Sequence, residues 1–225
     1  MEAYRGINMN LVATLTTSQP LLLQGVFMTL RLWCVALVIA LIVGCLWGVL
    51  RSRKLRITGI SLILDAVTFI LRGIPFYVQL LIAYFVIPGL LGIDISAFFA
   101  ATISLGICSA AYISQMVRGG INAVADGQWL AAQALGYSSP QMLRFIILPQ
   151  VTRIILPALT GECDQLLKST SIISAIGVLE ITRAGMNIIA RQMNPLSIYT
   201  AVALLYLILS SLLNIASYFL ERRLS

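Results

Sequence analysis

Residues 131–150, with the sequence AAQALGYSSPQMLRFIILPQ, contain two short helical patterns in a chain that otherwise consists of long apolar runs. Good helix formers occupy residues 128–135, and Gly136 supplies a stop. The SSPQ sequence that follows restarts a helix, because Ser138 is a favourable cap, proline suits the first turn, and Gln141 completes a capping box. The sequence therefore predicts a compact helical pair joined at a glycine.

The second helix of this pair has an apolar face, formed by Met142, Phe145 and Ile146, and Pro149 is expected to end it. A short helix that exposes apolar side chains on the cytoplasmic side of a membrane protein is suited to bind another protein. A surface hairpin without any partner is the alternative.

The rest of the chain is too apolar for a soluble domain. Of its 225 residues, 60% are hydrophobic and 10% are charged, and the mean hydropathy is +0.97. A soluble domain has about half apolar and about a quarter charged residues. The net charge of +7 comes without a nucleic-acid motif, so it fits the basic loops of a membrane protein better than binding to DNA or RNA. We expect an all-α membrane protein.

The cysteines do not suggest a metal or redox site. They lie singly in or beside apolar segments, and the chain contains no histidine. We therefore expect them to be packing residues and expect no metal. They are Cys34, Cys45, Cys108 and Cys163.

Five membrane segments are expected, because a span needs about 20 apolar residues. The second segment is too long for one straight crossing and is interrupted at Gly73 and Pro75. In the first, Gly44 and Gly48 form a G-x-x-x-G pair that lets another helix approach closely. The segments are expected near residues 22–50, 57–88, 96–117, 154–176 and 196–220.

The first 20 residues are expected to form a separate segment outside the membrane core. They lack a central apolar run, so they are not a cleavable signal, and their leucine spacing allows a short helix on the membrane surface. Residues 21–225 would then form one transmembrane domain, with a cytoplasmic loop at 126–150.

The basic residues predict the orientation. Arg5, Arg183 and Arg191 would lie outside, so the N-terminus is expected outside and the C-terminus in the cytoplasm. Nine others would share the cytoplasmic side: Arg51, Arg53, Lys54, Arg56, Arg118, Arg144, Arg153, Arg222 and Arg223.

Several motifs resemble the permease subunits of ATP-driven bacterial importers. GQWLAAQALG (127–136) followed by LPQVTRIILPAL (148–159) is similar to the EAA loop of that family. LRGIPFYVQLL (71–81), YISQMVRGGI (112–121) and KSTSIISAIGVLE (168–180) resemble its polar-amino-acid branch. The resemblance runs from about residue 25 to the C-terminus, and the most specific part is the G-x(9)-I-x-L-P spacing of Gly136, Ile146, Leu148 and Pro149.

This resemblance implies a multi-pass protein of the bacterial inner membrane with five core spans. It also implies a second permease copy or paralogue, cytoplasmic ATPase subunits that use the ATP, a periplasmic or lipid-anchored solute-binding protein, and an amino-acid substrate. The chain itself would be no enzyme and would bind no cofactor. The residues implied to dock on the ATPase are Ala131, Ala132, Leu135, Gly136, Ser138, Met142, Phe145, Ile146, Leu148 and Pro149.

Four positions depart from the family pattern. Leu130 replaces the glutamate that usually opens the loop motif, and Gln115 stands where glutamate is frequent. Gly161 replaces a frequent asparagine, and Asp164 adds a carboxylate where an apolar residue is common.

Charged groups inside the spans are candidates for a substrate path, because each costs about 2.5–3.5 kcal/mol at the bilayer centre on insertion scales. Glu162, Asp164, Lys168 and Glu180 belong to the fourth span and its exit. Asp164 and Lys168 are four residues apart, so a helix pairs them. A self-neutralising structural pair and a lining that contacts an amino acid both remain open. Hydroxyls in the same region are Ser169, Thr170, Ser171 and Ser174.

Arg72, beside the break at Gly73 and Pro75, is the other candidate. It could meet a substrate carboxylate, but an ion pair with Asp65 is favoured. Two other arginines need no special role: Arg31 is expected to reach the outer headgroups and Arg118 to snorkel. The candidate path comprises Arg72, Tyr112, Gln115, Glu162, Asp164, Lys168, Ser169, Thr170 and Ser171.

Three other functions remain open at this stage. A passive channel would conduct without ATP, a structural subunit would only recruit a partner, and a related importer would carry another small solute such as an osmolyte. Neither a phosphate-binding loop nor a nucleophile–histidine pair occurs in the sequence, which argues against nucleotide binding and intramembrane catalysis.

Overall fold

The computed structural model describes residues 11–55 and 57–224, with side chains described for 18–55 and 57–223. The described chain is helical and contains no strand. Its α-helices are α1 (Leu11–Leu50), α2 (Thr58–Gly73), α3 (Phe76–Leu81), α4 (Ile87–Leu91), α5 (Ala97–Ala123), α6 (Asp126–Ala134), α7 (Ser139–Met142), α8 (Leu148–Ser169), α9 (Ile181–Gln192) and α10 (Pro195–Leu224).

Within the described residues, four helical segments are long and apolar enough to cross a membrane, and a bent pair makes a fifth candidate. The four are residues 18–50, 97–123, 139–176 and 195–223. The bent pair joins α2 to the segment from Phe76 to Leu91 at an angle of 105°. With the bent pair counted as one span, this agrees with the five predicted segments, and it confirms the predicted interruption between Gly73 and Pro75.

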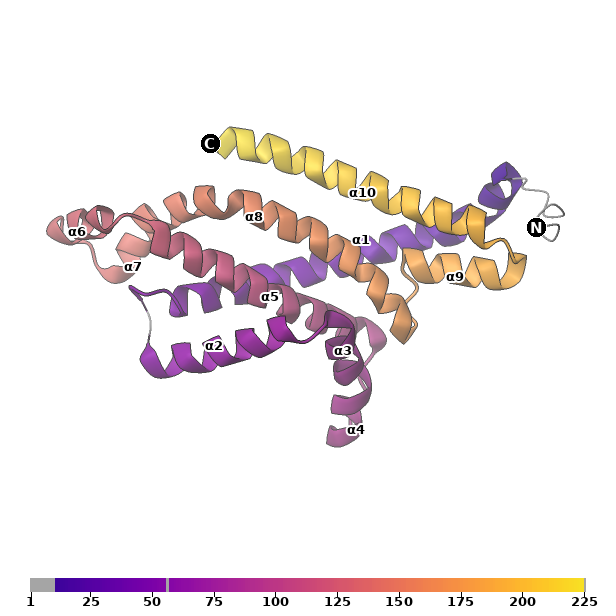
Figure 1. The fold of residues 1–225 in the computed structure, drawn as a ribbon, viewed down its shortest axis with the longest axis horizontal. Coiled ribbons are helices and arrows are strands. Elements are labelled where there is room, and N and C mark those ends of the chain that lie inside the picture. The colour runs from indigo at the N-terminus through magenta and orange to yellow at the C-terminus, as the bar shows by residue number, and fades with distance from the viewer. Residues whose placement is uncertain (1–10, 56, 225) are drawn as a thin grey trace.

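The two ends of the bundle contain different parts of the chain (Figure 1). The last turns of α10, α6, α7 and the end of α1 lie at one end, whereas the start of α1 and α9 lie at the other. The basic segments predicted to share one side therefore do share one end of the molecule. That this end faces the cytoplasm stays a prediction.

The first helix is longer than expected. Because α1 begins at Leu11 and continues through Pro20, residues 11–20 belong to the same helix as the first span and form no separate short helix. Residues 1–10 lie outside the described part of the chain, and the predicted surface segment at 1–20 stays a prediction there.

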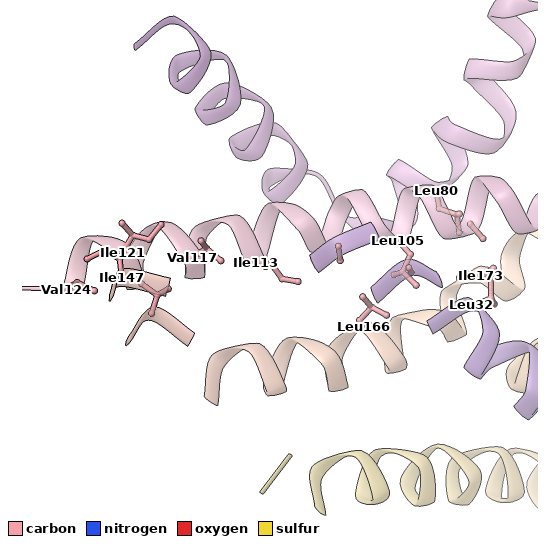
Figure 2. Packing of buried hydrophobic residues seen from close by; sticks show 14 of the residues in the cluster. Leu32, Leu80, Leu105, Ile113, Val117, Ile121, Val124, Ile147, Leu166 and Ile173 are labelled. Carbon is pink, nitrogen blue, oxygen red and sulfur yellow. The ribbon is translucent and has the colours of Figure 1, made fainter. Parts of the chain in front are cut away.

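The core is built on close packing of α1 against α5. A Cβ atom added at Gly48 would lie 2.5 Å from Val117 Cβ, and one at Gly44 would lie 2.8 Å from Ile113 Cβ. The predicted small-residue face of the first span therefore does permit close helix contact. Figure 2 shows Ile113 and Val117 in the row of buried side chains that follows α5 through the bundle.

The helical pair at 128–149 does not end at Pro149, and this prediction was wrong. A π-helical segment at Leu143–Ile147 connects α7 directly to α8, with Pro149 in the first turn of α8. The same arrangement occurs at Ile82–Val86, which precedes Pro88. A proline in regular helix would clash with the carbonyl four residues earlier, and the wider π turn relieves this clash.

Candidate functional site

A cavity of about 490 Å³ lies where the helix breaks between α2 and α3. The break supplies residues 72–76, and α5 and α8 supply the remaining walls. Leu105 and Leu166, labelled in Figure 2, form part of its apolar lining. Its polar lining consists of Arg72, Ser109, Tyr112, Glu162, Gln165 and Ser169, with Cys108 beside them.

Two opposite charges face this cavity without pairing with each other. The Arg72 guanidinium lies 5.4 Å from the centre of the Tyr112 ring and makes no ion pair within the described chain. Glu162 Oε1 accepts a hydrogen bond from Ser109 Oγ at 2.5 Å. The cavity therefore offers a cation and a carboxylate that retain capacity for further contacts.

The predicted ion pair between Arg72 and Asp65 is wrong. Asp65 Oδ1 lies 2.6 Å from Nη2 of Arg51, which directly follows α1, and 3.2 Å from Nη1 of Arg118 on α5. Arg72 is two helical turns, about 10 Å, away from Asp65 along α2. Arg118 is therefore held by an ion pair and does not merely snorkel.

The same cluster accounts for Gln115. Arg51 is buried, and beyond Asp65 it donates to Ser114 Oγ at 2.8 Å and to Gln115 Oε1 at 3.3 Å. Gln115 thus belongs to a closed network near the end of α1 and does not line the cavity. We call Arg51, Asp65, Ser114, Gln115 and Arg118 the closed network.

Four further predicted path residues also lie outside the cavity: Asp164 and Lys168 on α8, and Thr170 and Ser171 in the 3-10 helix Thr170–Ile176 that follows it. The expected pair of Lys168 Nζ and Asp164 Oδ2 is confirmed at 2.6 Å, and Asp164 also accepts a hydrogen bond from Ser210 on α10. The Thr170 hydroxyl donates to Leu167 O, and that of Ser171 donates to Lys168 O. Only Arg72, Tyr112, Glu162 and Ser169 of the predicted set are brought together in the cavity.

The sequence reasoning missed Ser109 and Gln165. Both are spaced by three residues from predicted path residues, Ser109 from Tyr112 and Gln165 from Glu162. Residues three apart share a helix face. This spacing would have found them, whereas their closeness across two helices is a property of the fold.

Glu180 is a helix cap. Its side chain is fully buried, and its carboxylate accepts hydrogen bonds from the backbone N–H groups of Thr182 and Arg183, each at 2.7 Å. The Tyr206 hydroxyl donates to the same carboxylate at 2.8 Å. These contacts attach the start of α9 to α10. Glu180 does not line the cavity.

The turn between α6 and α7 follows the sequence prediction. Gly136 has a φ of +80°, a left-handed conformation that glycine adopts without strain. The Ser138 N–H donates to Gln141 Oε1 at 2.9 Å, as a capping box requires. The helical pair is therefore built by the local signals in its own sequence.

The apolar residues of this pair face two ways. Trp129, Ala132 and Met142 are buried in the main core, so the prediction that Met142 belongs to the exposed face is wrong. Leu130, Leu135 and Phe145 are 65%, 75% and 60% exposed. We call these three side chains the apolar knob, because they project from a unit whose other face is anchored in the bundle.

Comparison with a family model supports a transport role. Residues 36–225 match the model described as binding-protein-dependent transport system inner membrane component. Two curated relatives match over nearly their whole lengths. The arginine transport system permease protein ArtQ of Bacillus subtilis (strain 168) is 36% identical over 217 residues, covering 96% of this chain and 98% of the relative. The glutamine transport system permease protein GlnP of Escherichia coli (strain K12) is 36% identical over 207 residues, covering 91% and 93%.

Solved structures share the fold. An amino acid ABC transporter described as crystallised with histidines matches with a TM-score of 0.86 at 31% identity, covering 96% of this chain and 100% of the matched chain. The methionine ABC transporter MetNI in an inward-facing conformation matches with a TM-score of 0.79 at 24% identity, covering 92% and 97%. The second likeness concerns the fold alone.

Proposed function

The chain belongs to the inner-membrane components of binding-protein-dependent transport systems, and from that premise we propose that it is the permease subunit of an ATP-driven importer of polar amino acids. It is a multi-pass protein of the inner membrane and a transporter subunit, not itself an enzyme. Arginine and glutamine are the substrates named for its relatives, so small polar amino acids are the first candidates here.

The observation that carries this proposal is the apolar knob on the anchored α6–α7 unit. In a bundle whose spans are covered by lipid, these exposed side chains lie at an end of the molecule, beside charged loops. Exposed apolar side chains in water favour a protein partner. The occupant we propose is a cytoplasmic ATPase subunit, which places this end of the bundle in the cytoplasm.

The helix that bears Phe145 also lines the cavity. Residues 139–176 form one continuous helical segment, so Phe145 and Glu162 lie on the same segment, about 25 Å apart along its axis. A partner that closes on nucleotide would displace the knob and move the α8 wall of the cavity with it. Such a motion would open the cavity to one side of the membrane and then to the other.

The cavity chemistry suits an amino acid. Arg72 is placed to attract an α-carboxylate, and Glu162 is placed to attract an α-amino group or a cationic side chain. A second permease copy or paralogue would complete the path, and a solute-binding protein would deliver the substrate at the end that bears α9.

The test is co-purification of the permease with its ATPase, followed by ATP hydrolysis and uptake of labelled L-arginine or L-glutamine into vesicles. Replacing Phe145→Ala should weaken assembly and reduce coupled ATP hydrolysis at least about tenfold. The matched control is Phe27→Ala, an exposed phenylalanine in the first half of α1. Unchanged assembly and coupled hydrolysis in the Phe145 variant would refute docking at the knob, and flux without ATP would identify a passive path instead.

A further inference from the structure

The helix break beside the cavity leaves backbone carbonyls in need of donors. In a continuous helix Leu71 O would accept from the N–H of residue 75, but that residue is Pro75 and has no N–H. Ile74 O also lacks its usual helical donor, the N–H of Val78, because that group donates to Pro75 O at 3.0 Å instead. Where such a carbonyl is shielded from water inside a bilayer, the missing hydrogen bond is costly.

One side chain supplies both donors. Gln79 Nε2 lies 2.7 Å from Leu71 O and 2.7 Å from Ile74 O. A carboxamide nitrogen carries two hydrogens, so both are used, on two carbonyls that precede Pro75. Because both partners are carbonyls, the nitrogen and not the oxygen of the amide must face them.

Gln79 is itself held in place. The next residue, Leu80, is fully buried in the main core, and α3 packs against α5. Gln79 Nε2 also lies 3.8 Å from Cys108 Sγ on α5. The amide therefore connects the end of α2 to the part of the bundle that does not bend.

The bend and the cavity share the same residues. Residues 72–76 form one wall of the cavity, and the hydrogen bonds of Gln79 hold Leu71, which precedes this wall, and Ile74, which belongs to it. We propose that Gln79 is a positioning residue that holds the 105° bend and thereby keeps Arg72 in the cavity wall. Its effect on substrate rests on the proposed function, whereas its effect on the bend does not.

The first test measures the bend in the full chain without substrate or partner. Spin labels at Ile63 on α2 and Leu90 on α4, which are 66% and 80% exposed, report the distance between the two arms in lipid nanodiscs. The background replaces the four native cysteines by alanine and must retain the wild-type helix content and unfolding temperature. Gln79→Leu should broaden the distance distribution, because two carbonyls lose their donors. Gln24→Leu, an exposed glutamine on α1 with no hydrogen-bond partner in the described chain, is the matched control.

Restoring the missing N–H makes the test more specific. In Pro75→Ala the backbone of residue 75 can donate to Leu71 O, and α2 can continue without the help of Gln79. Combining Pro75→Ala with Gln79→Leu should therefore straighten the helix and give a longer, narrower distance than Gln79→Leu alone. Additive effects of the two substitutions would overturn the inference, as would a Gln79→Leu distribution identical to that of the control.

The second test separates positioning from general damage. In reconstituted complexes, Gln79→Leu should raise the half-saturating concentration of L-arginine or L-glutamine about tenfold. ATP hydrolysis without substrate should stay at the wild-type rate, because the knob is untouched. An unchanged half-saturating concentration alongside an altered bend would remove the link to Arg72. If the wild type imports neither amino acid while the bend responds as described, the proposed function fails and the role of Gln79 in the bend stands.

Discussion

The cavity and the closed network hold similar charged groups in the same bundle, but they differ in how completely those groups are paired. In the closed network, Asp65 contacts two arginines, and Arg51 also contacts Ser114 and Gln115. In the cavity, Arg72 stacks on Tyr112 without an ion pair in the described chain.

This difference separates two uses of charge in a membrane protein. A charge whose partners lie in the chain itself stabilises the packing of helices. A charge that faces a cavity with unused capacity is available for a ligand. Substitutions in the first group should therefore affect stability, and substitutions in the second should affect transport.

The largest expected effect is the loss of Asp65. Asp65→Ala leaves the buried Arg51 and its neighbour Arg118 without a carboxylate, and unpaired buried charge is strongly destabilising. Because the Asp65 side chain is 42% exposed, we expect a loss of about 2 kcal/mol in the free energy of unfolding, less than for a fully buried pair. Thermal unfolding of the purified chain in detergent measures this. Asp94→Ala, in an exposed connection, serves as control and should leave the unfolding temperature unchanged.

Arg72→Met should have the opposite profile. Because no ion pair is lost, the unfolding temperature should stay within error of the wild type. Uptake of the substrate should fall about tenfold, the size of one charge-assisted contact. Arg31→Met is the control, since its guanidinium also stacks on an aromatic ring, 4.7 Å from the centre of Phe98, but lies outside the cavity. A drop in stability equal to that of Asp65→Ala would erase the distinction between the two regions.

Substitutions in the pair of Asp164 and Lys168 test whether the Asp164 carboxylate has a structural role. Asp164→Leu alone should cost about 1 kcal/mol of stability, because Lys168 and Ser210 lose a partner. The double variant Asp164→Leu with Lys168→Leu should be nearly neutral, since removing both charges removes the need for pairing. Neither variant should change the half-saturating substrate concentration. A marked change in that concentration would place this pair in the path after all.

The smallest effect is expected at the start of α6. The Lys54 ammonium lies 2.6 Å from Asp126 and, through its hydrogen bond and its charge, lowers the pKa of this exposed carboxylate. A carboxyl whose folded pKa is lowered contributes stability above its ordinary pKa and loses it as the pH falls through the lowered value. The protection factors of the α6 amides in hydrogen exchange should therefore fall slightly at acidic pH in the wild type. In Lys54→Met they should be lower already at neutral pH and should depend less on acid.

Local signals in the sequence predicted much of the fold. The apolar runs predicted the spans, Gly73 and Pro75 predicted the break, and the turn at Gly136 formed as expected. These signals act over one or two turns of helix, so neighbouring residues contain all of the information. The prediction for Pro149 failed because the same proline is compatible with a stop or with a π turn, and packing into α8 selected the latter.

The sequence by itself determined that the chain crosses the membrane as helices and bears an apolar helical pair in one loop, because burial in lipid and helix capping depend on composition and short spacings. Only the tertiary structure decided which charges are satisfied. Arg51 and Gln115 form a hydrogen bond although they are 64 residues apart in the sequence. Because helix packing selects such partners, the sequence analysis assigned Asp65 to the wrong arginine. It also could not distinguish Glu162, which lines the cavity, from Asp164, which contacts Ser210 on α10.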